Sequence, residues 1–246
     1  MVGKDAKMGI RKAVILAGGQ GTRLRPITYK IPKALVRVHG RTTIEHLLDL
    51  LKSYGIQDII LAVGYLKEMI KENFKDGSAY GVNIKYIVEE FPLGTAGPLY
   101  LAKKDLNQTF IVTNGDELKN IEIDKMYSLH KRKKALITIA LTAVEDVSNY
   151  GVARIDSKDK DRIIEFIEKP KKEDAPSNLI SAGFYIIEPK VLEFINEGFS
   201  MLEKDVFPKI ANLKKLYGYR FKGQFYDIGT IEKYKKAIKE WKDIKT

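Results

Sequence analysis

The sequence predicts an α/β protein with one mixed sheet that is mostly parallel and gains antiparallel strands in the C-terminal half. Over the first 145 residues, short β-branched runs alternate with segments whose apolar residues recur at helical spacing. After that point, strand-like runs follow one another without long helices between them. Because strands joined by helices pair in parallel and strands joined by short connections pair antiparallel, these two patterns predict the fold class.

The first strand is expected at 12–17, where the apolar run KAVILA ends at a glycine. The segment 43–55 carries apolar residues at helical spacing and also ends at a glycine, as helices often do. Right-handed crossovers would place the helices on both faces of the sheet, giving a three-layer, Rossmann-like arrangement. The other elements expected in this half are strands at 58–64, 83–90, 109–116 and 135–144, and helices at 66–74, 94–104 and 123–134.

The C-terminal half is expected to extend the same sheet and to end in a helix. Its strand-like runs are close together in sequence, which favours antiparallel pairing. No linker, repeat or low-complexity segment divides the chain, so a single domain is predicted. The elements expected here are strands at 150–156, 161–170, 181–189 and 215–223, and helices at 189–196, 201–210 and 230–243.

The composition excludes several classes of protein. A chain without cysteine has no disulfide, thiolate metal site or cysteine nucleophile. No apolar run approaches the roughly 18 residues of a membrane span, and the N-terminal residues are too polar for a signal peptide. We therefore expect a cytoplasmic protein without a membrane partner. The net charge of +11 is compatible with nucleic acid, but the lysines lack interleaved aromatic residues, which favours a solvated surface.

The segment LAGGQGTRLRPIT at 16–28 follows the first strand and is rich in glycine and arginine. Glycines let the backbone approach a phosphate closely, and Arg23 is suited to bind a terminal phosphate through two hydrogen bonds. The segment lacks the Gly-Lys-Ser/Thr ending of a P-loop, and Leu24 stands where a dinucleotide-binding loop needs a small residue. Taken alone, it is equally compatible with a surface turn that carries two solvated arginines.

Other charged residues fall near the ends of predicted strands. Lys33 follows a proline in IPKAL, Asp116 ends the strand predicted at 109–116, and Asp227 lies in a predicted turn before the last helix. Two carboxylates brought together at this edge could bind Mg²⁺, with phosphates and water as the remaining ligands. Taken singly, each aspartate is more often a turn or capping residue. Glu168 and Lys169 stand at a strand end, before Pro170.

Eight motifs together resemble those of the sugar-1-phosphate nucleotidyltransferases. The resemblance runs from about residue 11 to 240 and implies one nucleotidyltransferase domain over 1–246, without a C-terminal β-helix. It implies a nucleotide-binding part at about 11–145 and a sugar-phosphate-binding part at about 146–246. The implied reaction joins an NTP and a sugar 1-phosphate into a nucleotide sugar and pyrophosphate. The motifs, in order, are LAGGQGTRLRPIT, PKAL, PLGTAGPL, NGD, EKP, SAGFYI, EKDVFP and YDIGT.

The resemblance also implies roles for individual residues. Arg23 would hold the leaving phosphates, Lys33 would contact the pyrophosphoryl region or the α-phosphate, and Lys169 would bind the phosphate of the sugar. Asp116 and Asp227 would hold Mg²⁺, the implied cofactor. The residues implied in nucleotide binding are Ala17, Gly18, Gly19, Gly21, Thr22, Glu89, Gly94 and Thr95, and those implied in binding the sugar phosphate are Gly151, Glu168, Lys169 and Ser181.

The base and the sugar are inferred from two of these positions. Glu89 stands where the family reads the base, and a carboxylate, which only accepts hydrogen bonds, matches the two adjacent donors of guanine better than the single donor of uracil. The motifs most resemble mannose-1-phosphate guanylyltransferases, so we expect GTP and mannose 1-phosphate. UTP- or dTTP-dependent glucose-1-phosphate transferases and a heptose-1-phosphate guanylyltransferase remain alternatives, because Ser181 replaces the asparagine frequent in mannose-type members.

Two other classes of protein compete with an active enzyme. A catalytically dead regulatory relative would be expected to lack at least one of the charged residues named above, yet all are present. A glycosyltransferase usually carries an Asp-x-Asp metal motif, but Asn114 precedes Asp116 here. The expected partners are therefore small-molecule substrates and not nucleic acid, and a homo-oligomer is left open.

Overall fold

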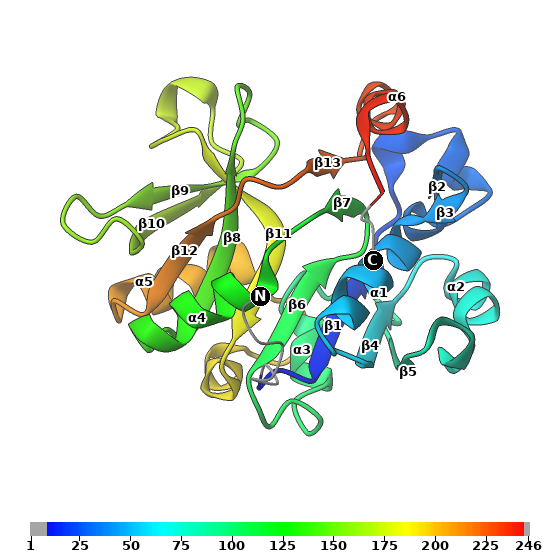
Figure 1. Ribbon diagram of the computed structural model, residues 1–246, viewed down its shortest axis with the longest axis horizontal. Helices are drawn as coiled ribbons and strands as arrows, with labels where there is room; N and C mark the ends of the chain where they lie inside the picture. Colours follow the sequence, from blue (N-terminus) through cyan, green and yellow to red (C-terminus); the bar gives the residue numbers. More distant parts are fainter. Residues whose placement is uncertain (1–8, 244–246) are drawn as a thin grey trace, which may run out of the picture.

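The computed structural model describes residues 9–243, which form a central mixed sheet with helices on both faces (Figure 1). The helices are α1 (Thr43–Ser53), α2 (Lys67–Phe74), α3 (Gly97–Leu101), α4 (Ile123–Lys133), α5 (Phe207–Asn212) and α6 (Ile231–Glu240). The strands are β1 (Lys12–Ala17), β2 (Arg37–Val38), β3 (Arg41–Thr42), β4 (Asp58–Val63), β5 (Asn83–Val88), β6 (Phe110–Asn114), β7 (Glu117–Lys119), β8 (Ile137–Ala143), β9 (Gly151–Ile155), β10 (Ile163–Glu168), β11 (Leu179–Ile187), β12 (Leu216–Arg220) and β13 (Phe225–Asp227).

The N-terminal half of the sheet is parallel, as the alternating pattern predicts. β1 lies between β4 and β6, and β5 pairs with β4 at the edge. All four strands run in the same direction, so their carboxyl ends at Ala17, Val63, Val88 and Asn114 lie at one edge of the sheet. This edge is where open α/β sheets bind ligands, and the loops that follow these strands carry most of the predicted site residues.

The C-terminal half extends the sheet through β11, which pairs antiparallel with both β6 and β8. β9 and β10 form a further antiparallel pair that joins β11 near Ile180. The predicted antiparallel additions are confirmed for these three strands. β12, in contrast, pairs in parallel with β8, because the chain crosses through α5 before it returns to the sheet.

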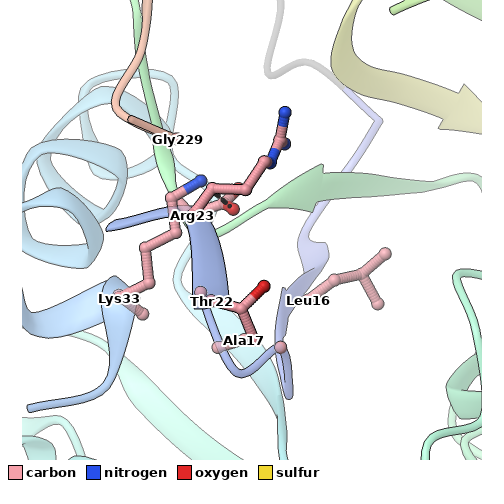
Figure 2. Close-up of a pocket in the computed structure, with 10 residues that line it drawn as sticks. Leu16, Ala17, Thr22, Arg23, Lys33 and Gly229 are labelled. Carbon is pink, nitrogen blue, oxygen red and sulfur yellow. Dashed lines mark hydrogen bonds and ion pairs between the residues drawn. The ribbon is translucent and has the colours of Figure 1, made fainter. Parts of the chain in front are cut away.

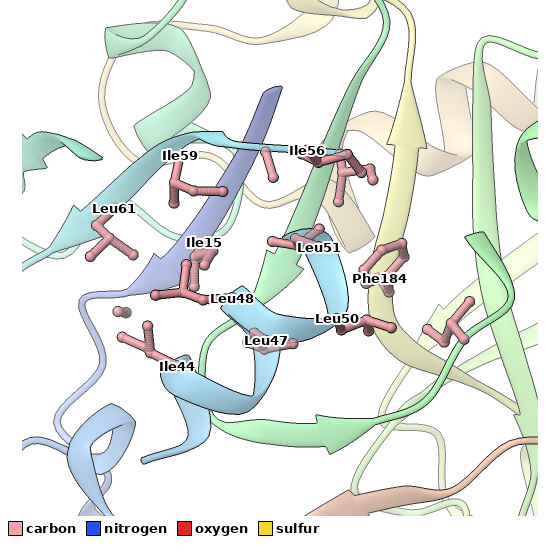
Figure 3. Close-up of a cluster of buried hydrophobic side chains, with 14 of the residues drawn as sticks. Ile15, Ile44, Leu47, Leu48, Leu50, Leu51, Ile56, Ile59, Leu61 and Phe184 are labelled. Atoms are coloured by element: carbon pink, nitrogen blue, oxygen red, sulfur yellow. The ribbon is translucent and has the colours of Figure 1, made fainter. Parts of the chain in front are cut away.

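The two faces of the sheet bury separate apolar clusters. Neighbouring residues of a strand point to opposite faces, so Ile15 of β1 packs in one cluster with α1 and α4 while Val14 packs in the other with α3 and α5. Figure 3 shows α1 side chains lying over Ile15, Ile59 and Leu61 of β1 and β4. The predicted three-layer architecture is therefore confirmed.

Several short elements differ from the prediction. The helix expected at 94–104 is limited to α3, because the loop before it packs against the chain at 198–203. The helices expected at 189–196 and 201–210 are a 3₁₀ helix at Pro189–Phe194, and a π-helical turn at Leu202–Val206 that leads into α5. No helix within residues 9–243 is long and apolar enough to cross a membrane.

The two-stranded ribbon of β7 and β13 was not predicted, and it corrects the expected position of Asp227. This aspartate is the last residue of β13, not part of a turn, and it pairs with Glu117 of β7. Asp116 lies just before β7, in the turn that follows β6. The ribbon thus places two aspartates that are 111 positions apart in the chain beside each other.

Candidate active site

The glycine-rich segment follows β1 at the carboxyl edge of the sheet, and Gly18 meets Glu89 there. A Cβ atom at Gly18 would collide with Glu89 Oε1, so glycine lets this carboxylate lie against the backbone without moving. Glu89 follows β5, and its other oxygen accepts a hydrogen bond from the Leu93 N–H at 3.2 Å. Burial raises the pKa of Glu89, and this hydrogen bond opposes the increase.

A cavity of about 230 Å³ lies beside this segment, and we call it the glycine-loop cavity. Figure 2 shows Lys33 and Arg23 extending into it beside Gly229. Arg23 is exposed and donates a hydrogen bond to Asn149 Oδ1 at 3.1 Å, which connects the two halves of the chain. The cavity is lined by Leu16, Ala17, Gly19, Gly21, Thr22, Arg23, Lys33, Ala34, Asp116 and Gly229.

Lys33 bridges the two aspartates that are proposed as metal ligands. Its Nζ lies 2.6 Å from Asp116 Oδ2 and 3.7 Å from Asp227 Oδ1. Burial by itself would lower the pKa of Lys33, but the charges of both carboxylates outweigh that effect and raise it. The pKa of Asp227 is lowered: burial opposes this, but the charges of Lys33 and Lys233 prevail. Lys33 and Asp227 therefore stay charged at neutral pH, and the carboxylates of Asp116 and Asp227 converge on the Lys33 ammonium group.

Two residues that the sequence did not predict, Lys233 and Tyr150, donate hydrogen bonds to the other oxygen of Asp227, Oδ2. Lys233 of α6 donates to Asp227 Oδ2 at 2.8 Å, and it also donates to the Tyr150 hydroxyl at 2.7 Å. Asp227 Oδ1 accepts the Gly229 N–H at 2.7 Å. The sequence gives no signal for this role of Lys233, because α6 contains several other lysines.

A second cavity, of about 220 Å³, lies between the ends of β9 and β10, and we call it the Glu168 cavity. At its wall, Lys169 Nζ lies 3.2 Å from Glu168 Oε1. The Ser181 hydroxyl also lines it but is engaged inside the protein, since it donates to the Tyr185 hydroxyl and accepts the Gly183 N–H, each at 3.2 Å. The lining residues are Arg23, Lys33, Thr95, Asn114, Asp116, Glu117, Asn149, Tyr150, Gly151, Phe166, Glu168, Lys169, Ser181, Gly183, Tyr185, Met201, Glu203 and Asp227.

A buried ion pair between Glu117 and Lys119 lies beside this cavity, and it was not predicted from the sequence. Lys119 is inaccessible to solvent, and its Nζ donates to Glu117 Oε2 at 2.7 Å and to the Ala182 carbonyl at 2.8 Å. The pair joins β7 to β11 and thereby fixes the ribbon that carries Asp227. The available signal was the segment ELK, in which two charged residues flank a leucine.

A third cavity, of about 470 Å³, opens beside the end of β5, and we call it the Glu89 cavity. Its lining includes Phe199, which is 65% exposed and was not predicted from the sequence. The predicted residues Gly94 and Thr95 form part of its wall. The complete lining is Leu16, Gly18, Gly19, Gln20, Glu89, Pro92, Leu93, Gly94, Thr95, Asn114, Asp116 and Phe199.

Asp116 lines all three cavities, so they form one cleft along the carboxyl edge of the sheet. Arg23 and Lys33 line both the glycine-loop and the Glu168 cavities, and Thr95 lines both the Glu89 and the Glu168 cavities. The structure therefore brings together every residue that the sequence put forward for this site. The cleft contains cationic side chains that can bind several phosphates, and it has hydrogen-bond acceptors at each end.

The pair of aspartates fits a divalent ion of the Mg²⁺ type. Their carboxylates approach the same point, now taken by the Lys33 ammonium group, and carboxylate oxygens are the ligands this ion prefers. No group of three or more histidine, aspartate or glutamate side chains with metal-binding geometry occurs within residues 9–243. Two carboxylates are sufficient for Mg²⁺ when substrate phosphates and water supply the other ligands.

Comparisons with known proteins show the family to which the chain belongs. The nucleotidyl transferase family matches residues 12–243. A mannose-1-phosphate guanyltransferase of Saccharomyces cerevisiae is 41% identical over 223 residues, which are 89% of this chain and 61% of that protein. The chain belongs to the nucleotidyl transferase family. This nucleotidyltransferase chain spans about three fifths of the length of the curated relatives that it matches.

Solved structures of similar fold cover almost the whole nucleotidyltransferase chain. One, from Bacillus anthracis, carries the provisional name glucose-1-phosphate thymidylyltransferase; it is 28% identical, has a TM-score of 0.86, and 96% of each chain is covered. Another is HddC from Yersinia pseudotuberculosis complexed with GMP-PN, which is 30% identical with a TM-score of 0.79 and covers 95% of this chain and 100% of that one.

Proposed function

We propose that this chain transfers a guanylyl group from GTP to mannose 1-phosphate, giving GDP-mannose and pyrophosphate. One observation carries the proposal: three cavities that suit a base, a triphosphate and a sugar phosphate meet at Asp116. In the reaction, a phosphate oxygen of the sugar phosphate attacks the α-phosphorus of GTP. The bond from that phosphorus to the oxygen bridging it to the β-phosphate breaks, and its electron pair leaves with pyrophosphate.

The proposed reaction depends on positioning and charge neutralisation more than on proton transfer. A sugar phosphate has a second pKa near 6, so its attacking oxygen is already ionised at neutral pH. Arg23 and Lys33 face the glycine-loop cavity, where they would bind the phosphates that leave. Lys169 faces the Glu168 cavity and would bind the phosphate that attacks. The sugar phosphate and the α-phosphate of GTP, which are both anions, could then approach each other.

Asp116 and Asp227 are the residues that would hold Mg²⁺ in this proposal. When bound, the ion supplies positive charge that offsets the negative charge developing on the transferred phosphate. Lys33 lies between the same carboxylates, so its ammonium group would move toward phosphate oxygens as the ion binds. Lys233 and the Gly229 N–H hold Asp227 in place during this exchange.

The choice of GTP rests on Glu89 and on two relatives. The Glu89 carboxylate faces a cavity of about 470 Å³ and can accept the two adjacent donors of guanine. The Saccharomyces cerevisiae relative is a mannose-1-phosphate guanyltransferase, and the Yersinia pseudotuberculosis structure contains GMP-PN. Mannose is supported by the former relative alone. Because both substrates are small cytoplasmic metabolites, we propose a cytoplasmic location.

A pyrophosphate-release assay with ATP, CTP, GTP and UTP against a panel of sugar 1-phosphates tests the proposed function. The panel contains mannose, glucose and a heptose 1-phosphate, each with and without Mg²⁺. We expect the highest kcat/KM for GTP with mannose 1-phosphate and loss of turnover when Mg²⁺ is chelated. Preference for UTP with glucose 1-phosphate would contradict the proposed substrates, and no release with any pair would contradict the activity itself.

Glu89→Gln is expected to lower the selectivity for GTP over UTP by about tenfold, because the amide presents only one acceptor oxygen to guanine. The raised pKa of Glu89 adds a pH dependence with a defined sign. Protonation of the carboxyl group removes an acceptor, so wild-type selectivity should fall as pH decreases from 7 toward about 5. The measurement is the ratio of kcat/KM values for GTP and UTP across this pH range.

The neighbouring Glu90→Gln variant is a matched control, since Glu90 is 72% exposed and pairs with Lys67 on the surface. Selectivity and its pH profile should stay at wild-type values in this control. The Glu89→Gln variant, in contrast, should show a selectivity that no longer changes with pH. If Glu89→Gln kept the wild-type preference at pH 7, the base would be selected by other groups.

A further inference from the structure

Glu203 is a buried carboxylate at the wall of the Glu168 cavity that none of the roles above uses. It belongs to the π-helical turn Leu202–Val206, and the residue is only 8% exposed. The Thr95 hydroxyl donates a hydrogen bond to Glu203 Oε2. Within the part of the chain that the structure describes, this is the one side-chain donor that contacts the carboxylate. A carboxylate has two oxygens and about four acceptor positions, so capacity remains on the cavity side.

The position of Glu203 is fixed by the loop that precedes α3. The Ser200 carbonyl accepts the Ala96 N–H at 2.9 Å, and the Leu202 N–H donates to Thr95 Oγ1 at 2.8 Å. A Cβ atom at Gly94 would lie 2.4 Å from the Ser200 oxygen, so the two segments are packed as closely as glycine permits. These contacts fix the backbone of the turn, and the hydrogen bond from Thr95 holds one oxygen of the Glu203 carboxylate.

The other polar groups on this side of the cavity are already engaged. The Ser181 hydroxyl bonds to Tyr185 and Gly183, and Glu117 is paired with buried Lys119. Glu168 contacts Lys169 at 3.2 Å, which leaves its second oxygen available. A sugar in this cavity presents several hydroxyl donors, and each must find an acceptor or lose a hydrogen bond with water. Glu168 and Glu203 are the carboxylates positioned to accept them.

We infer that Glu203 accepts a hydrogen bond from a hydroxyl of the sugar ring, as a second carboxylate of the sugar subsite beside Glu168. The inference deepens the proposed function and rests on it. It also accounts for the serine at position 181, whose hydroxyl is directed into the protein. Glu203 thus determines specificity: it favours sugar 1-phosphates that carry the matching hydroxyl over analogues that lack it, because the analogue leaves a buried carboxylate without a donor.

Glu203→Gln is the decisive variant because its orientation is predictable. The Thr95 hydroxyl oxygen already accepts the Leu202 N–H, so its hydrogen must go to an acceptor on residue 203. The amide oxygen of glutamine would take that hydrogen, which leaves the NH₂ group facing the cavity. The variant therefore replaces an acceptor by a donor at the sugar without changing the size of the side chain.

The experiment compares wild type and Glu203→Gln with mannose 1-phosphate and with its 2-, 3-, 4- and 6-deoxy analogues, measuring pyrophosphate release from GTP. We expect the variant to lower kcat/KM for mannose 1-phosphate by about 10- to 100-fold, the range of one hydrogen bond to a charged group. One deoxy analogue should lose little further activity in the variant, which identifies the hydroxyl. The Kd of GTP, measured by calorimetry, should change by less than about twofold.

Asp205→Asn is the matched control, because Asp205 lies in the same turn and accepts the Met201 N–H at 2.7 Å without lining the cavity. It should behave as wild type with every analogue. If Glu203→Gln matched this control, or lost activity equally with all the deoxy analogues, the inference would be wrong while the proposed function stood. Wild-type protein that released no pyrophosphate with any sugar 1-phosphate would overturn both.

Discussion

Asp227→Asn is expected to lower turnover by about 10²- to 10³-fold, the effect of removing one group that offsets charge in a transition state. The amide keeps the shape of the side chain and can still accept the Gly229 N–H, but it loses the negative charge that faces Lys33 and Lys233. With one carboxylate left at Asp116, the proposed Mg²⁺ site has lost half of its protein ligands. The Mg²⁺ concentration needed for half-maximal turnover should therefore rise as kcat falls.

The measurements are kcat over a Mg²⁺ titration and the circular dichroism of the variant during thermal unfolding. Asp174→Asn is a matched control, since Asp174 is exposed in a short turn away from the cleft. It should leave both kcat and the Mg²⁺ requirement unchanged. A folded Asp227→Asn protein with near-normal turnover and an unchanged Mg²⁺ titration would remove Asp227 from the metal site.

Lys169→Met is expected to lower kcat/KM for the sugar phosphate by about 10²-fold while leaving GTP affinity within about twofold of wild type. Lys169 lies directly after β10 and lines the Glu168 cavity, where Lys33 is the other lysine of the lining and contacts Asp116. Methionine keeps an unbranched side chain, one atom shorter than that of lysine, and the backbone N–H that donates to the Tyr150 carbonyl at 3.0 Å. The loss should therefore report the missing charge on the attacking phosphate.

Separate titrations of GTP and mannose 1-phosphate distinguish this effect from general damage. Lys171→Met provides the control, because Lys171 is an exposed lysine two residues further along the same segment. A loss of GTP affinity in Lys169→Met, equal to the loss for the sugar phosphate, would place Lys169 with the triphosphate instead. An unchanged kcat/KM would mean that the sugar phosphate is bound by other cations.

The parallel half of the fold was predictable because each of its elements carries a local signal. The run at 12–17 is apolar on both faces, and the segment at 43–55 has one apolar face and ends at a glycine. Such patterns depend on residues close in sequence. The parallel pairing of β12 with β8 depends instead on which edge of the sheet is available to it. The residues of β12 carry no local signal for that choice.

The candidate site also has residues that the sequence predicted and residues that only the structure identified. Arg23, Lys33, Asp116, Lys169 and Asp227 could be named from motifs, because each stands beside glycines or prolines that mark a strand end. Their supporting residues could not be named so, since contacts across the chain define those roles. Lys233 reaches Asp227 from α6. Glu203 begins the EKDVFP motif, but the motif did not place it at the Glu168 cavity; the turn that is packed on the loop before α3 does so.

The sequence by itself therefore determined the fold class, the family and the charged groups proposed for the reaction, because short runs of residues carry the signals for those properties. Only the tertiary structure decided that one cleft joins them. Asp116 and Asp227 become neighbours because β7 pairs with β13. Lys119 is buried because it donates to the Ala182 carbonyl of β11, beside its ion pair with Glu117 of the same strand. Pairing between distant strands depends on the whole packed chain, so it sets the geometry of the proposed metal site and of the proposed sugar subsite.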